Sequence, residues 1–199
     1  MEKNIRKILN PFISKNKLEN DVLLGLISGF CKKLGSIEVK PQKFPFYGST
    51  KYIHLKTDFG PSFIFFIRKE FYGRSGQTHK PDILIFEGEV PPGKRENPKP
   101  SVVIEIKGGK QTKESHREFI YEILSKSIDF LPKLSILITE CESEKEEYIA
   151  QGYDGMLNYY GIQHHTIMDD HNHFEECLPK AIFNGISEEF TRKRLEKVF

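Results

Sequence analysis

The chain has 199 residues, a net charge of +2, and 29% charged against 38% apolar residues, which suits one globular domain with a sizeable core. This net charge is too small to identify a nucleic-acid-binding protein from composition alone. If the protein has a basic surface, it must come from local clustering of Lys and Arg. Three scattered cysteines, no signal-peptide pattern and no membrane-length apolar run lead us to expect a soluble cytoplasmic protein without a membrane partner.

The first half of the chain predicts a helix followed by strands. Residues 15–34 repeat apolar side chains at helical spacing. Extended segments follow at 51–57 and 62–68, and the second is apolar on both faces, as inner strands are. The stretch HKPDILIF then opens a third buried strand with Pro81 and Asp82. An aspartate is a poor strand former and costly to bury, so its position calls for a partner.

A second helix and two more strands complete the expected core. A loop rich in proline and charge precedes SVVIEIK at 101–107, and LSILITE at 134–140 predicts another buried strand. Between them, residues 112–131 predict the second helix. The order is helix, three or four strands, helix, strand, within a core at 15–140 of a single domain spanning 1–199.

Beyond the core, residues 141–199 predict a layer of a strand and helices packed on it. A charged helix begins near 142, and a strand is expected near 163–168. A C-terminal helix is expected with Ser187, Glu188 and Glu189 at its start, where acidic residues complement the helix dipole.

Three charged residues carry the chemistry. In SVVIEIK the side chains alternate faces, so Glu105 and Lys107 point the same way. If the Asp82 strand lies beside it, two carboxylates meet on neighbouring strands and can hold Mg²⁺ together with waters and phosphate oxygens. The Lys107 ammonium would then orient the attacking water and stabilise the charge that develops in the transition state.

Pro81-Asp82 followed by Glu105-Ile106-Lys107, in this order of elements, resembles the PD-(D/E)XK nuclease superfamily. The resemblance implies an α/β fold with a restriction-endonuclease-like αβββαβ core, a mixed central sheet flanked by helices. It implies Mg²⁺ or Mn²⁺ as cofactor, with Asp82, Glu105 and the Ile106 carbonyl as metal ligands and Lys107 as the catalytic lysine. Its members cut DNA, less often RNA.

The Glu-x-Lys tripeptide is not specific by itself. It occurs twice, about as often as chance predicts for 21 Glu and 23 Lys in this chain. The copy at 38–40 has no Pro-Asp strand before it, whereas the copy at 105–107 has both that strand and an apolar run. For each residue alone, a turn aspartate or an exposed charge pair is the simpler interpretation. The ordered set favours the site.

Glu19 is the candidate for an additional acidic ligand, because it lies in the middle of the apolar stripe of the first helix while Asp21 lies among the polar positions. A carboxylate in that stripe needs a cation, a metal or hydrogen-bond donors. The alternative is a first-turn glutamate that is favoured by the helix dipole. We weigh the two almost equally and favour the functional one.

Two residues after Lys107 are weaker candidates for nucleic-acid contact, Gln111 and His116. His116 lies within the apolar arc of the second helix, so a structural role is the stronger alternative for it. The arc runs through Phe119, Ile120, Ile123, Leu124, Ile128 and Leu131.

Two other features concern a histidine-rich segment and a basic segment. His164, His165, Asp169, Asp170, His171 and His173 lack a known ligand spacing, so a solvated polar turn is the favoured interpretation and their role stays open. The segment from Arg74 to Arg117 holds nine Lys/Arg and six Asp/Glu, a local charge of +3, which favours a phosphate backbone near the site.

The sequence therefore predicts a metal-dependent endonuclease that hydrolyses phosphodiester bonds in DNA, in a restriction, repair, mobile-element or defence role. RNA is an alternative substrate, and a junction-resolving nuclease is an alternative enzyme. A catalytically silent module that binds nucleic acid or a protein is the alternative outside enzymes; charges kept unpaired on buried strands would argue against it. A homodimer would suit cutting of two strands, although no dimer face is evident in the sequence.

Overall fold

The structure is a computed structural model that describes residues 2–34, 37–43, 51–57, 62–88, 99–168 and 172–195. The helices are α1 (Glu2–Leu9), the 3-10 helix η1 (Asn10–Phe12), α2 (Lys17–Leu34), α3 (Lys113–Phe130), α4 (Glu144–Gln151), α5 (Asp154–Tyr159) and α6 (Asn172–Leu195). The strands are β1 (Ile37–Lys43), β2 (Lys51–Thr57), β3 (Phe63–Ile67), β4 (Phe71–Tyr72), β5 (Thr78–His79), β6 (Ile83–Glu87), β7 (Val102–Lys107), β8 (Leu134–Glu140) and β9 (Ile162–Ile167).

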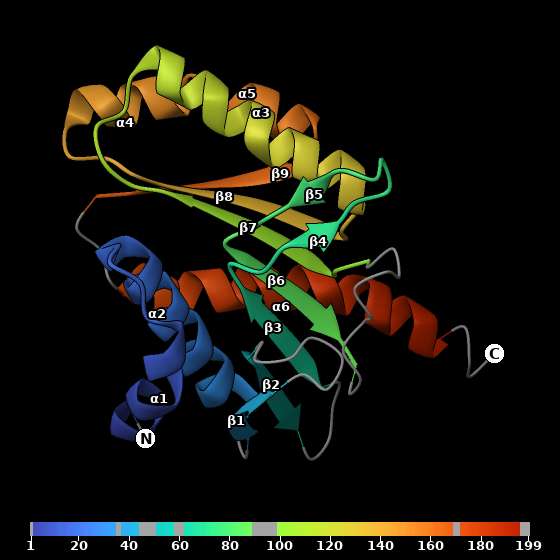
Figure 1. The fold of residues 1–199 in the computed structure, drawn as a ribbon. Helices are drawn as coiled ribbons and strands as arrows, with labels where there is room; N and C mark the ends of the chain where they lie inside the picture. Colours follow the sequence, from blue (N-terminus) through green and yellow to red (C-terminus); the bar gives the residue numbers. More distant parts are fainter. Residues whose placement is uncertain are drawn as a thin grey trace.

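Seven strands form one mixed sheet in the order β1-β2-β3-β6-β7-β8-β9. Neighbours are antiparallel from β1 to β7, and β7–β8 and β8–β9 are parallel. The predicted mixed α/β architecture with flanking helices is therefore confirmed, and the predicted strands at 51–57, 62–68 and 134–140 lie where expected. Helices α3, α4 and α5 lie on one side of the sheet, and α1, α2 and α6 on the other (Figure 1).

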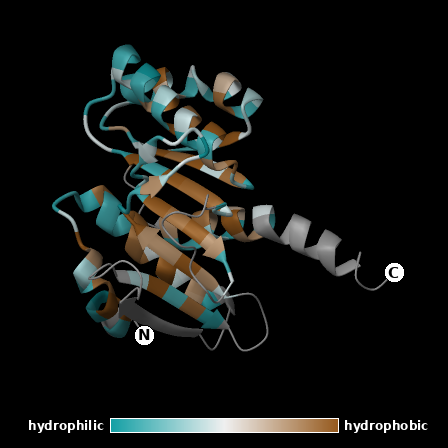
Figure 2. Cartoon of the chain, turned by 45° about the vertical axis from the view of Figure 1, so that its right-hand side comes forward, coloured by the Kyte–Doolittle hydropathy of each residue, from teal (hydrophilic) through white to brown (hydrophobic). Residues whose placement is uncertain are grey.

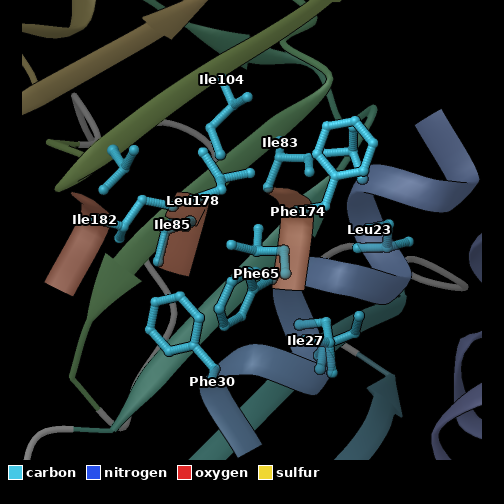
Figure 3. Close-up of a cluster of buried hydrophobic side chains, with 14 of the residues drawn as sticks. Leu23, Ile27, Phe30, Phe65, Ile83, Ile85, Ile104, Phe174, Leu178 and Ile182 are labelled. Atoms are coloured by element: carbon cyan, nitrogen blue, oxygen red, sulfur yellow. The ribbon is translucent and has the colours of Figure 1, made fainter. Parts of the chain in front are cut away.

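Each face of the sheet has its own apolar core, because the inner strands β3, β6, β7 and β8 are buried on both faces. Figure 2 shows these strands as the most hydrophobic part of the ribbon. One core packs strand residues such as Phe65, Ile83 and Ile104 against Phe30 of α2 and Phe174 of α6 (Figure 3). The other packs strand residues against α3, and includes Phe66, Leu84, Val103, Ile120 and Ile123.

The C-terminal helix differs from the sequence prediction. It begins at Asn172, so Ser187, Glu188 and Glu189 lie in its interior and do not start it. The reason is burial: Phe174, Leu178 and Ile182 recur at helical spacing and bury against α2. Gly25 of α2 permits the close approach, since a Cβ there would lie 2.5 Å from the Phe174 Cβ.

Helix α3 also faces the sheet differently than the apolar arc predicts. Ile128 and Leu131 are exposed, whereas Lys126 and Asp129 are buried. The buried face of α3 includes these two charged residues because each has a polar partner there. Lys126 forms ion pairs with Glu105 and Glu122, and Asp129 is hydrogen-bonded to Ser75 and His79. Thr112 caps the helix by accepting a hydrogen bond from the Ser115 N–H, which sets its first turn just beyond β7.

Some predicted features lie outside the described residues, including the loop at 89–98, the turn at 58–61, and Asp169, Asp170 and His171. Within the described part of the chain, none of the helices combines the length and apolar character needed to cross a membrane.

Candidate active site

Asp82 lies immediately before β6, beside Glu105 of the neighbouring strand β7. The antiparallel register pairs Ile83 with Ile104, so the next position along places Asp82 across from Glu105. The Asp82 Oδ2 accepts a hydrogen bond from the Ile106 N–H at 2.8 Å. The aspartate that opens the strand therefore continues the ladder between β6 and β7 with its side chain and brings two carboxylates together.

Glu105 and Lys107 share the α3 side of β7, as strand alternation predicts, and they join two residues of α3. The Lys126 Nζ lies 2.6 Å from the Glu105 Oε1 and 2.7 Å from the Glu122 Oε1. The Lys107 Nζ lies 2.6 Å from the Glu122 Oε2 and 3.5 Å from the Glu105 Oε2. Two carboxylates and two ammonium groups thus alternate in a closed ring. This charge ring consists of Glu105, Lys107, Glu122 and Lys126.

Burial raises the pKa values of both carboxyl groups of the acidic pair, Asp82 and Glu105. Burial, and next the charge of Asp82, raise the pKa of Glu105 to about 7, although Lys126 opposes both. Burial also raises the pKa of Asp82, against the opposing effects of the Ile106 hydrogen bond and the Lys107 charge. Two neighbouring buried carboxylates with raised pKa values are favoured sites for an added cation.

The other half of the ring stays charged. Burial alone would lower the pKa of Lys107, but Glu122, Glu105 and Asp82 outweigh it, so the pKa is raised. Burial alone would raise the pKa of Glu122, yet hydrogen bonds from Lys107 and Lys126 lower it to about 2. Lys107 is therefore an ammonium at neutral pH, suited to orienting water and stabilising negative charge and unsuited to acting as a base.

Glu19 meets a protein cation. Its Oε2 lies 2.6 Å from the Arg68 Nη1, and Arg68 also donates through Nη2 to the Phe12 carbonyl. Arg68 follows β3 with a φ of 48°, and its N–H donates to the Asp82 carbonyl at 2.9 Å. Glu19 is close enough to Asp82 to raise the pKa of that carboxyl group. Glu19 is a first-turn residue of α2, as one alternative predicts, and its role as an additional acidic ligand stays a prediction.

The two candidates for nucleic-acid contact are buried. Gln111 donates from its Nε2 to the Gly109 and Glu140 carbonyls at 2.8 and 3.3 Å. His116 is fully buried, stacked on Tyr153 with ring centroids 5.5 Å apart. Burial, and next the charge of His164, lower its pKa to about 4. Neither side chain is presented to solvent, and within the described part of the chain both ring nitrogens of His116 are buried without a hydrogen-bond partner.

The acidic pair fits a divalent cation of the Mg²⁺ class. Asp82 and Glu105 supply two oxygen ligands, and Mg²⁺ accepts one or two carboxylates with water and substrate oxygens for the rest. Among the described residues, no group of three or more His, Cys, Asp or Glu side chains is arranged to hold a metal. A bound ion would therefore compete with the Lys126 ammonium for the Glu105 carboxylate.

Sequence reasoning missed Arg68, Glu122 and Lys126. A signal for Lys126 existed: it follows Phe119 by two helical turns, so it shares that side of α3, and Glu122 precedes it by one turn. Charged residues are normally placed on the exposed face, which hides this signal. Arg68 carries no comparable mark, because its partner Glu19 is 49 residues away in the chain.

A second buried polar cluster has a structural role. The Asp129 Oδ2 accepts from the Ser75 hydroxyl at 2.7 Å and lies 2.5 Å from the His79 Nε2. In a nucleophilic triad the histidine would stand between serine and aspartate. Here the aspartate stands between them and ties the β4–β5 hairpin to the end of α3.

The histidine-rich segment is ordered within the described residues and is not a solvated turn there. His164 stands in β9, with Nε2 2.9 Å from the Thr139 hydroxyl and Nδ1 2.6 Å from the Asp154 Oδ1. The His165 Nδ1 lies 2.9 Å from the His173 Nε2. These pairings join β9 to α5 and α6.

A surface groove of about 500 Å³ borders the first turn of α3. Cationic and aromatic side chains line it, among them Lys113, Arg117, Tyr148 and Tyr153. Such a combination suits the phosphates and bases of a nucleic-acid strand. The Tyr153 ring is held by its hydroxyl hydrogen bond to the Lys113 carbonyl at 3.3 Å.

Comparisons with known proteins found no matching family model, curated protein or solved structure.

Proposed function

We propose that this protein is a metal-dependent phosphodiesterase of the PD-(D/E)XK type, most simply an endonuclease acting on DNA. The observation that carries the proposal is the row formed by Asp82 and Glu105 on adjacent strands, with Lys107 two residues further along on the face of Glu105. The order α2, β3, β6, β7, α3, β8 supports a restriction-endonuclease-like core.

The residues divide the work. Asp82, Glu105 and the Ile106 carbonyl would hold Mg²⁺ or Mn²⁺, and a bound ion would polarise the phosphodiester and lower the pKa of a water. Lys107 would orient that water. As the water oxygen bonds to phosphorus and the P–O bond to the leaving sugar oxygen breaks, the attacking water would lose a proton to solvent and the sugar oxygen would gain one from solvent, while the ammonium stabilises the negative charge on the phosphate oxygens. Glu19, held by Arg68, would border the site as an additional acid.

A catalytically silent binding module is the second candidate, and one observation favours it. The buried charges are paired within the chain: Lys126 lies 2.6 Å from Glu105, and Arg68 lies 2.6 Å from Glu19. A protein without catalytic activity would have no reason to keep unpaired charges on buried strands. Here the ion pairs are themselves a structural reason to keep these charges, so their presence does not by itself indicate catalysis.

Cleavage assays distinguish the two. Supercoiled plasmid, a synthetic four-way junction and a labelled RNA would be incubated with Mg²⁺, Mn²⁺ or EDTA, with wild type, Glu105→Ala and Lys107→Ala. Lys110→Ala is the matched control, since Lys110 is an exposed lysine three residues after Lys107.

Metal-dependent cutting that is lost in Glu105→Ala and Lys107→Ala and kept in Lys110→Ala is the expected result. The preferred substrate then chooses between DNA, junction and RNA. If none of the substrates is cut while DNA binding is equal in all variants, the binding module replaces the nuclease.

A further inference from the structure

The charge ring has one member that can leave it. Side-chain exposure is 1% for Glu105, 6% for Lys126 and 21% for Lys107, but 42% for Glu122. Glu122 is therefore the outermost carboxylate, and rotation about its side-chain bonds would take it into solvent. The two ammonium groups that it now bridges would remain, facing the space that it vacates.

The way in which Glu122 is held resembles the way in which a phosphodiester would be held. Its Oε2 lies 2.6 Å from the Lys107 Nζ, and its Oε1 lies 2.7 Å from the Lys126 Nζ. A phosphodiester also carries one negative charge shared by two non-bridging oxygens. Ammonium groups bind such oxygens as point charges, which makes a pair of lysines a suitable seat for it.

The position agrees with the proposed chemistry. Lys107 and Lys126 both approach Glu105, and Glu105 lies opposite Asp82. A phosphate group seated between the two ammonium groups would therefore lie next to the acidic pair. The 5.8 Å distance from the Lys107 Nζ to the Phe119 ring centroid helps to fix that lysine while its partner changes.

We propose that Lys107 and Lys126 form a phosphate-binding site in which the Glu122 carboxylate holds the place of the phosphate group until a nucleic-acid strand displaces it. This deepens the proposed function and rests on it for the identity of the strand. Lys126 is then a substrate-binding residue, and Glu122 is an internal competitor that weakens the binding of anions.

The test is binding in EDTA, where metal-dependent cleavage is silent. The probe is a fluorescein-labelled ten-nucleotide oligothymidylate, titrated by anisotropy against wild type, Glu122→Gln, Lys126→Gln and the double variant. Glu118→Gln is the matched control, because it removes the same charge from an exposed position one turn away on α3. Far-UV circular dichroism and a melting curve check that each variant is folded.

We expect Glu122→Gln to tighten binding about fivefold, since one screened ion-pair competitor is removed. The gain should disappear in the Lys126→Gln background and should be absent in Glu118→Gln. An equal gain in Glu118→Gln would mean that only net charge matters, and an unchanged gain without Lys126 would remove that lysine from the site; either overturns the proposal. If Lys126→Gln does not fold, the comparison of Glu122→Gln with Glu118→Gln decides alone.

A cleavage assay with Mg²⁺ on the same preparations separates the two proposals. The binding pattern without any cleavage by wild type would leave the phosphate site standing and refute the nuclease. Cleavage by wild type without the binding pattern would support the nuclease and refute the phosphate site.

Discussion

The two faces of the central sheet are built from different chemistry. Against α2 and α6 the sheet packs a large apolar core that runs from Ile5 to Ile182. Against α3 it buries an apolar core and, beside it, Glu105, Lys126, His116 and Asp129. Buried charges stabilise a fold less reliably than apolar contacts do. The α2 and α6 face thus mainly provides stability, and the α3 face gives up some stability to position charged groups.

The largest expected effect separates the two sides of one strand. Lys107→Ala should lower the rate of metal-dependent cleavage by about 10²–10³-fold, as does removal of a group that stabilises transition-state charge. Ile104→Val on the opposite face of β7 should leave the rate unchanged and lower only the free energy of unfolding, by about 1 kcal/mol. Single-turnover rates and denaturant melts measure both. Equal losses of rate in the two variants would contradict a division of labour between the faces.

The apolar face should respond most strongly in stability. Phe30 is 1% exposed and makes edge contacts with Phe63 and Phe65 at centroid distances of 5.5 and 5.7 Å. Phe30→Ala should lower the free energy of unfolding by about 3–5 kcal/mol. Tyr121→Ala, at an exposed position of α3, should change it by less than about 0.5 kcal/mol. Urea unfolding of both variants provides the measurement, and a mild effect at Phe30 would argue against this packing.

On the α3 face, a pair of changes should cost less than one change. Lys126→Met leaves the buried Glu105 carboxylate without its 2.6 Å partner and should lower the free energy of unfolding by about 3 kcal/mol. Adding Glu105→Leu should recover most of that loss, because both charges are then gone. Chemical denaturation of the two single variants and the double variant gives the coupling energy. Additive losses would show that the ion pair is not the relevant interaction.

His116 should make stability depend on pH. Its pKa is lowered from 6.5 to about 4 in the folded chain. Between these two pH values the histidine is protonated in the unfolded chain and neutral in the folded chain. The free energy of unfolding should fall as pH decreases from 6.5 to 4, by up to about 3 kcal/mol from this residue. His116→Phe, which keeps a ring against Tyr153, should flatten the profile over that interval. An unaltered profile would assign the dependence to other groups, such as His165.

The smallest expected effect concerns the groove beside α3. Arg117→Ala should weaken DNA binding in EDTA by about two- to threefold at low salt, less at high salt, as the loss of one phosphate contact does. Lys145→Ala, an exposed lysine of α4 outside the groove lining, is the control. Anisotropy titrations at two salt concentrations make the comparison, and equal effects would assign binding to general charge.

Sequence patterns predicted the inner strands, because burial on both faces leaves a short apolar run rich in β-branched residues, whereas β1, β4 and β5 were not predicted. The boundaries of β3 and β8 follow from such runs. The predicted start of the C-terminal helix at 187–189 is too late, because the buried apolar spacing of Phe174 and Leu178, and not a local capping signal, sets where the helix begins. Local propensity is a weak predictor where a helix packs against another helix.

Alternation and apolar runs are properties of neighbours in the chain, so the sequence by itself determined the inner strands, helices α2 and α3, and the shared face of Glu105 and Lys107. The tertiary structure decided that the Asp82 segment lies beside the Glu105 strand. Only the tertiary structure decided which charges meet. Lys126 is 21 residues beyond Glu105, and Arg68 is 49 beyond Glu19. A charged side chain on a helix has no local pattern that reveals an inward partner, since the energy that holds it there arises only when distant segments fold together.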